Sequence, residues 1–360
     1  MAIFDPTDLT WNGEEVKTLG ETIIEKVYAK PALSSIHTLK TGIKAKTQIA
    51  FLSQLGLVGK KQGAGCAPTA STSTVGATEK IWEPEYIEDR WVECWKDLQE
   101  SFFIWGLKDG LSKPDLTSTD FIRFLSEVVG DAMAEAVLRL AWFGDTAAAH
   151  YNSSPTGVIK NSIDLDFFNP IDGFWKQLFA IGAADSNRLT TTLATKNAQT
   201  SYSDQAFNST DTTNKIAINT LEQMKYSADF RLRGQSGLVF YCTQSFMDQY
   251  AKELRSQSLD TSFTRIEAGY NSLQFEGIPV VGLDFLDRNI RSYQDNGTKY
   301  YRPHRVVLTT REELQIATEN ESNFSEIDAF YDKKEKQQYV DFAFNIDAKV
   351  IEDEMVQVAY

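Results

Sequence analysis

Three glycine-containing stretches hold residues whose types and spacing could do chemistry. Gly56-Leu-Val-Gly59-Lys60-Lys61 has the composition of a phosphate-binding loop, but it lacks the Gly-x4-Gly-Lys-Ser/Thr spacing, and no Ser or Thr follows the lysine. Gly63-Ala-Gly65 lacks the third glycine of a dinucleotide loop. Gly234-Gln-Ser236-Gly237 is one residue short of the turn that exposes a nucleophilic serine. None of the three predicts a phosphate site or a hydrolase.

The metal-ligating residue types are also spread apart. His37, His150 and His304 form no His-x-x-x-His or Glu-x-x-His pair, so a zinc or di-iron site is not predicted. Cys66, Cys94 and Cys242 have neither metal-ligand spacing nor the pattern of a disulfide framework. Acidic pairs such as Glu83 and Glu85 are more typical of charged surfaces than of catalytic dyads. We predict no cofactor, no metal and no enzymatic activity, although residues that meet only in the fold stay open.

Composition limits the class of partner. The 360 residues contain 36 Lys and Arg against 50 Asp and Glu, a formal net charge of −14, which argues against a broad nucleic-acid-binding surface. This charge suits a soluble protein, and it also suits a container wall that does not adhere to polyanionic contents. The N-terminus has no secretory signal, and no apolar stretch approaches the ~20 residues of a membrane helix. A reducing cytosol and no membrane are expected.

One long helix dominates the elements that must position any site. Apolar residues recur at helical spacing over residues 118–143, Thr117 to Asp120 offer N-cap oxygens, and Gly144 stands where a C′ glycine would end the helix. At ~1.5 Å per residue, about 24 helical residues give a length of roughly 36 Å. Gly130, in mid-helix, costs roughly 0.5–1 kcal/mol relative to alanine and needs a reason, either close packing or a bend.

Before this helix, the sequence predicts a long two-stranded projection. Residues 62–77 are small, polar and glycine-rich, so they cannot bury enough apolar surface to order themselves. They lie between two extended arms, which predicts a hairpin with a mobile tip over residues 38–90. An ordinary surface loop is the alternative. Trp82, Trp91, Trp95 and Trp105 are expected in a core or an interface, and the spacing of Trp91, Trp95, Leu98 and Phe102 indicates a helix.

After the long helix, the chain alternates between strand and helix patterns. Helices are expected around residues 174–182, 214–228 and 246–254, and strands around 237–243, 273–281 and 305–309. The tail, residues 339–347 and 349–360, alternates apolar and polar residues as half-buried strands do. These segments indicate an α+β protein.

The order of these features resembles a known family. A long helix, the stop Phe143-Gly144-Asp145, and the strand entry Pro155-Thr-Gly157-Val resemble the backbone-helix region of tailed-phage major capsid proteins, which have the Hong Kong 97-type fold. The resemblance implies a long backbone helix, an extended β-hairpin loop, and peripheral and axial domains. It divides the chain into an N-terminal arm (1–37), the extended loop (38–90), a peripheral domain (91–163 with 325–360) and an axial domain (164–324).

The function implied by the resemblance is assembly. Subunits would tile into hexamers and pentamers of an icosahedral shell that encloses double-stranded DNA without sequence-specific binding, in the virion and, during assembly, in the host cytoplasm. The short N-terminal arm implies a separate scaffolding protein, and portal and decoration proteins would be further partners. No covalent cross-link between subunits is predicted. The residues expected to matter for assembly are Lys60, Lys61, Trp82, Gly130, Gly144, Asp145 and Gly157.

Three other functions stay open at the level of sequence. An encapsulin has the same fold and forms a cellular cage for cargo enzymes, so the packaged content would separate the two. A tail or tube protein is a second structural alternative, against which the long helix argues. An acidic cytosolic enzyme is the alternative from a different class, and it predicts a small oligomer with a pocket.

Overall fold

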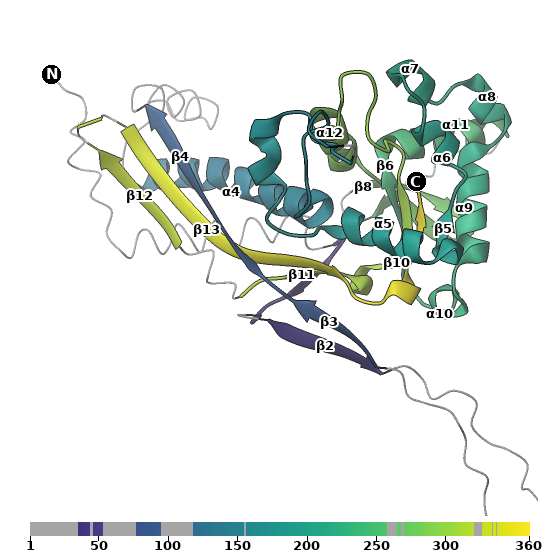
Figure 1. Ribbon diagram of the computed structural model, residues 1–360, viewed down its shortest axis with the longest axis horizontal. Helices are drawn as coiled ribbons and strands as arrows, with labels where there is room; N and C mark the ends of the chain where they lie inside the picture. The colour runs from purple at the N-terminus through teal and green to yellow at the C-terminus, as the bar shows by residue number, and fades with distance from the viewer. Residues whose placement is uncertain are drawn as a thin grey trace, which may run out of the picture.

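The structure is a computed structural model that describes residues 35–43, 46–52, 77–94, 118–154, 156–257, 265–267, 270–319, 326–332, 334–335 and 337–360. A rounded lobe around a mixed sheet lies at one end, and a long curved strand and the long helix extend from it (Figure 1). Several residues named in the sequence analysis lie outside the described residues: Lys60, Lys61, the tip at 62–76, Trp95 and Trp105.

The rounded lobe is built on a seven-stranded mixed sheet. Its strand order is β5-β14-β10-β6-β9-β8-β7. The strands are β5 (Leu189–Thr190), β6 (Leu238–Thr243), β7 (Arg265–Glu267), β8 (Tyr270–Phe275), β9 (Ile278–Leu283), β10 (Val306–Thr310) and β14 (Gln357–Ala359). β6 and β9 run parallel, with Phe240 opposite Val280, whereas β10 runs antiparallel to β6.

Helices cover both faces of this sheet, and the sequence of β6 shows why. Alternate residues of a strand point to opposite faces, so Val239 and Tyr241 enter one core while Phe240 and Cys242 enter a second. The second core packs on α9 (Ile216–Ser227) and α11 (Gln244–Ser256), and the first packs on α5 (Phe174–Ala184) and α12 (Asp284–Tyr293). Short helices complete this lobe: α6 (Ala194–Asn197), α7 (Tyr202–Gln205), α8 (Ser209–Thr213), α10 (Phe230–Arg233), η2 (Ser162–Phe167), η3 (Ser186–Arg188), η4 (Arg311–Glu313) and η6 (Asp353–Met355).

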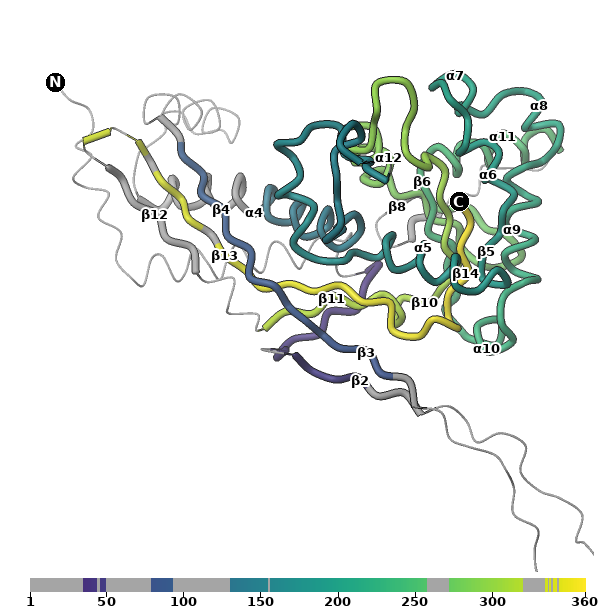
Figure 2. Tube along the Cα trace, viewed as in Figure 1, coloured from purple at the N-terminus to yellow at the C-terminus, as the bar shows by residue number. Residues whose placement is uncertain are grey.

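The long strand β13 (Gln337–Val350) organises the second sheet. It pairs antiparallel with β4 (Glu85–Cys94), β12 (Glu326–Asp332) and β11 (Leu314–Ala317), and β11 in turn pairs with β1 (Thr38–Lys40). Its buried residues Phe344, Ile346 and Val350 join the same core as α5, so the two sheets share one apolar interior. Figure 2 shows β13 running from the β12 end of the molecule to the rounded lobe.

The predicted long helix is α4, which spans Ser118–Phe143 as expected from the sequence. Its C-terminal half buries Met133, Val137, Leu140 and Ala141, at the spacing of one helical face. Gly130 is buried in this helix, whereas Asp131 is exposed.

A separate two-stranded sheet forms the projection that the sequence predicts. β2 (Thr47–Leu52) pairs antiparallel with β3 (Ala77–Trp82), with Thr47 opposite Trp82 and Leu52 opposite Ala77. The pair lies below β13 and outside the rounded lobe in Figure 1. The assignment of all of residues 38–90 to one loop stays a prediction, since β1 pairs with β11 and β4 continues to Cys94.

Two sequence predictions differ from the structure. Trp91 lies in strand β4, not in a helix, because this segment pairs along ten residues with β13. Residues 273–281 form a hairpin rather than one strand, since Glu276 and Gly277 adopt φ of 48° and 83°, as a two-residue turn requires. Residues 357–359 pair with β10 in the seven-stranded sheet, and the assignment of residues 325–360 to a peripheral domain stays a prediction.

Residues 1–34 lie outside the described part of the chain, so the N-terminal arm over residues 1–37 stays a prediction. Its last two residues, Ile36 and His37, are buried in the chain's own core. The His37 ring stacks on Phe174 at 5.4 Å between centroids and accepts a hydrogen bond from the Trp142 indole N–H at 2.7 Å.

Candidate functional site

The end of α4 meets the start of α5 in backbone-to-backbone contact. The Gly173 N–H donates to the Gly144 carbonyl at 2.9 Å, and the Gly144 N–H continues the helix to Leu140. A Cβ on Gly144 would lie 2.6 Å from the carbonyl oxygens of both Leu140 and Ile171. The sequence placed Gly144 correctly at the helix end, but a left-handed backbone is not the reason. Glycine is needed there because two backbone segments cross without room for a side chain.

Asp145 fixes the same junction by charge. Its carboxylate lies 2.6 Å from the Lys176 ammonium on α5, and Asp172 lies 2.7 Å from the same ammonium. Hydrogen bonds from Lys176 and from Thr146 lower the pKa of Asp172 against the opposing effect of burial. Trp142, with no exposed surface, packs below this network against Phe174 and Trp175. The junction is thus a rigid corner between the long helix and the rounded lobe.

Gly157 is a second close backbone approach, in the loop that follows this corner. A Cβ at this position would lie 2.2 Å from the His150 carbonyl oxygen. His150 and Ile159 form a parallel bridge, and Ile159 is buried in the main core. The chain therefore returns from the exposed loop to the core at the predicted strand entry.

The β2–β3 hairpin is anchored at its base by Trp82. This side chain is 3% exposed and packs against Ala317 and Ile351. The adjacent Lys80 ammonium donates to the Val350 carbonyl and to Asp353, both at 2.6 Å. Trp82 is therefore a core residue of its own chain, one of the two roles that the sequence predicted for it.

A buried carboxylate also stabilises the base of the β2–β3 hairpin. Asp347 on β13 accepts a hydrogen bond from the Glu83 N–H at 2.8 Å, just after β3 ends. Burial raises the pKa of Asp347 to about 6, against the opposing effect of Lys349. Burial likewise raises the pKa of Glu313 to about 6, and this side chain accepts the Glu352 N–H at 3.0 Å. No sequence pattern predicted these two carboxylates, because their burial depends on how β3, β11 and β13 meet.

The predicted assembly residues therefore do not form one site. Gly144 and Asp145 lie together at the junction, whereas Trp82 lies at the hairpin base and Gly130 inside α4. Gly157 lines a surface cavity described below. Lys60 and Lys61 lie outside the described residues.

One serine–histidine pair was missed in the sequence. The Ser245 hydroxyl lies 3.1 Å from His304 Nδ1, and His304 Nε2 lies 2.8 Å from the Gln205 carbonyl. The ring is 4% exposed, and burial lowers the pKa of His304 to about 4. His304 is therefore a weak base that is shielded from solvent, and it is poorly suited to general-base catalysis near neutral pH.

Other buried acids stabilise helix starts. Both Glu253 oxygens accept backbone N–H groups at the start of α9, from Ala217 at 3.0 Å and from Ile218 at 2.9 Å. Asp287 does the same for α11 through Gln244 at 2.5 Å. Across the described residues, no cluster of three or more His, Cys, Asp or Glu is arranged to hold a metal ion. None of the helices in the described ranges has the length and apolarity needed to cross a membrane.

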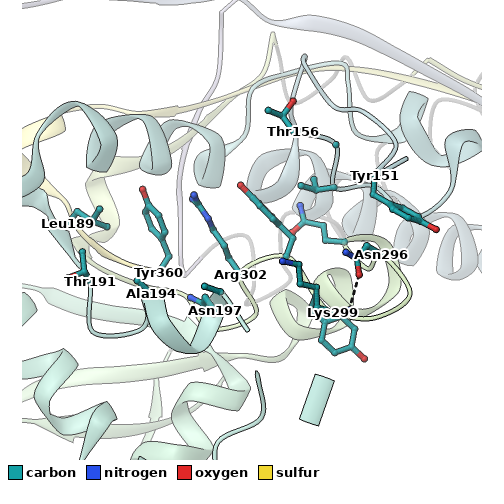
Figure 3. Close-up of a pocket in the computed structure, with 16 residues that line it drawn as sticks. Tyr151, Thr156, Leu189, Thr191, Ala194, Asn197, Asn296, Lys299, Arg302 and Tyr360 are labelled. Atoms are coloured by element: carbon teal, nitrogen blue, oxygen red, sulfur yellow. Dashed lines mark hydrogen bonds between the residues drawn. The ribbon is translucent and has the colours of Figure 1, made fainter. Parts of the chain in front are cut away.

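A surface cavity of about 640 Å³ lies between the 150–158 loop, the 294–302 segment and the C-terminus. Arg302 and Tyr360 lie side by side in it and point the same way (Figure 3). Tyr151, Gly157, Asn197 and Lys299 are among the other lining residues. The cavity combines aromatic and positively charged side chains.

Comparisons with known proteins bear on the fold. No protein-family profile matches the chain, and no curated protein sequence matches it. A chain of the satellite phage P4 procapsid, determined with its size determination (Sid) protein, has a similar structure at a TM-score of 0.51 and 10% identity, covering 95% of this chain and 97% of that one.

Two further structures are similar at lower scores. A chain of the cyanophage A-1(L) capsid gives a TM-score of 0.47 at 12% identity, with 92% of each chain covered. The SrpI encapsulin of Synechococcus elongatus gives 0.42 at 9% identity, covering 90% of this chain and 84% of that one. The match to the P4 procapsid extends over nearly the whole of both chains, and the chain has the α+β Hong Kong 97-type fold of phage capsid subunits.

Proposed function

We propose that this chain is the major capsid protein of a tailed double-stranded DNA bacteriophage. It assembles into hexamers and pentamers of an icosahedral shell. The observation that carries the proposal is the likeness to the P4 procapsid chain over 95% of this chain, with no large insertion left over for a different activity. The long helix, the rigid corner at Gly144 and the anchored hairpin supply a stiff body with one projecting element.

The surface supports association. Phe230 is 85% exposed and Ile163 is 80% exposed, and both lie on the rounded lobe. Tyr226 is also half-exposed, and the Arg233 guanidinium lies over both the Tyr226 and Phe230 rings. Exposed aromatic side chains beside arginine are enriched in protein interfaces. Many such modest contacts become cooperative when a shell closes.

The proposal names several partners. A separate scaffolding protein guides curvature, a portal occupies one vertex, and decoration proteins bind outside. The shell encloses DNA, and the net charge of −14 keeps the wall from adhering to it. The protein resides in the virion and, before assembly, in the host cytoplasm.

Negative-stain electron microscopy of the purified chain, alone and co-expressed with its scaffolding protein, tests the proposal. We expect closed, angular or rounded shells of uniform diameter. Purified virions should carry this chain as their most abundant protein around nuclease-protected DNA. Shells that instead enclose a cargo enzyme would make the chain an encapsulin-type protein. A small oligomer under every condition would contradict shell formation.

A further inference from the structure

Arg302 packs beside two aromatic rings on one wall of the surface cavity. Its guanidinium carbon lies 4.4 Å from the Phe179 ring centroid and 4.1 Å from that of Tyr360. The Arg302 backbone adopts φ of 44°, a left-handed conformation that is unfavourable for a residue with a side chain. The Phe179 and Tyr360 ring centroids are only 4.6 Å apart, so both rings lie on the same side of the guanidinium. Its N–H groups stay available for in-plane acceptors.

No ion pair joins Arg302 or Lys299 to a carboxylate in the described part of the chain, although both line the cavity. The nearby Asp295 is engaged, since Lys160 lies 3.2 Å from it and Tyr202 donates to it at 2.5 Å. The wall is therefore a local positive surface with free donors.

A third cation lies behind this wall. Arg305 is fully buried and donates to neutral acceptors, the Gln294 amide oxygen at 2.5 Å and the Tyr301 carbonyl at 2.7 Å. One of its terminal nitrogens, Nη1, has no hydrogen-bond partner. Burial, and to a smaller degree the charge of Arg302, lower the pKa of Arg305 to about 9. An anion held at Arg302 would offset this uncompensated charge.

We propose that the cavity binds the acidic N-terminal segment, residues 1–16, of a neighbouring copy of this chain. The proposal rests on the proposed function, because it requires subunits side by side. Residues 1–16 contain Asp5, Asp8, Glu14 and Glu15 and no Lys or Arg. Phe4 and Trp11 suit a cavity lined with tyrosines.

Reach and charge both favour this occupant. From residue 16 to Ser35, where the described chain starts, an extended backbone spans roughly 65 Å at ~3.4 Å per residue. This is an upper limit, and it exceeds the radius of gyration of roughly 21 Å expected for a compact chain of 360 residues, so the segment can extend beyond its own subunit. Nucleic acid is disfavoured because the chain as a whole repels polyanions, whereas a short peptide brings few charges to one local positive wall.

A zero-length cross-linking experiment tests the proposal. A water-soluble carbodiimide joins a lysine amine to a carboxylate only when the two are in contact. Assembled full-length protein from an equal mixture of ¹⁴N and ¹⁵N subunits is cross-linked, digested and measured by mass spectrometry. We expect Lys299 joined to a carboxylate of residues 1–16, with mixed isotope labels that show two different copies. The exposed Lys252, outside the cavity, is the internal control.

Two perturbations separate binding from chance proximity. Arg302→Gln retains Lys299 and should lower this cross-link about tenfold, whereas Arg255→Gln, an equal charge change on exposed α11, should not. A synthetic peptide of residues 1–16 should compete with the cross-link, and its Asn/Gln analogue should not. The peptide arm does not depend on the folding of any variant.

Three outcomes would overturn the inference: no cross-link at Lys299, links with unmixed labels, or equal competition by both peptides. Particle formation is scored separately by electron microscopy. Intact shells without the cross-link would reject the cavity occupant while leaving the proposed function standing. Absence of shells would reject the function itself.

Discussion

Substituting Gly144 by alanine should break the corner between α4 and α5. The added Cβ would lie 2.6 Å from the Leu140 and Ile171 carbonyl oxygens, whereas ordinary contact begins at 3.4 Å. About 0.8 Å of space must therefore open between backbone segments, not between flexible side chains. Overpacking of this kind costs roughly 1–3 kcal/mol.

Opening the corner also strains its hydrogen bonds. The Gly173 N–H to Gly144 carbonyl bond, at 2.9 Å, and the Asp145 N–H to Phe168 carbonyl bond, at 2.7 Å, both cross the gap. Each contributes roughly 0.5–1.5 kcal/mol, so the total loss should be about 2–6 kcal/mol. This is a large part of the 5–15 kcal/mol that typically stabilises a domain.

Urea unfolding of unassembled subunits, followed by tryptophan fluorescence, measures this change. Gly234→Ala is the matched control, because its Cβ would meet its nearest atom at 3.4 Å and its backbone is not left-handed. The control should lie within about 1 kcal/mol of the wild type. If Gly144→Ala unfolds with the free energy of the control, the close crossing does not explain the glycine.

Three further predictions concern Asp347, Gly130 and residues 62–77. The pKa of Asp347 is raised in the folded state, so that state binds the extra proton, and stability attributable to this group falls as pH rises from about 4 to 6. In urea unfolding across this pH range, the free energy of unfolding of the Asp347→Asn variant should fall by roughly 2–3 kcal/mol less than that of the wild type. The exposed Glu312→Gln variant should keep the wild-type pH dependence. Because Gly130 is buried in α4, Gly130→Ala should destabilise the subunit by roughly 1–3 kcal/mol. A mutant that is instead more stable, and whose shells stall as precursors, would indicate that Gly130 lets the helix bend. Residues 62–77 should be cleaved by proteases in free subunits and protected in shells, and equal cleavage in both would contradict a role in contacting neighbours.

Local patterns in the sequence were sufficient for the long helix and for most of the rounded lobe. The bounds of α4 were predicted because caps and a continuous apolar stripe act within the helix itself. The strand at Trp91 was not predicted, because the aromatic residues have helical spacing. Pairing with the distant strand β13 determines the strand conformation instead. The same limit applies to β14, whose partner β10 lies 50 residues away in sequence.

The residues of the candidate site were also predictable only in part. Gly144 and Gly157 were recognisable as special glycines, although their shared cause, backbone crossing, is a tertiary property. The aromatic contacts of Arg302 could not be predicted, because Phe179, Arg302 and Tyr360 come from three distant segments. Buried Asp347 and Arg305 look like ordinary surface charges in the sequence.

The central claim, that this fold is used to tile a shell, is tested most directly by cryo-electron microscopy of assembled particles. The account predicts a closed icosahedral shell of hexamers and pentamers. In that map the β2–β3 hairpin should extend from its base at Trp82 and lie over a neighbouring subunit. Particles without closed symmetry, or a hairpin that contacts only its own subunit, would contradict the account.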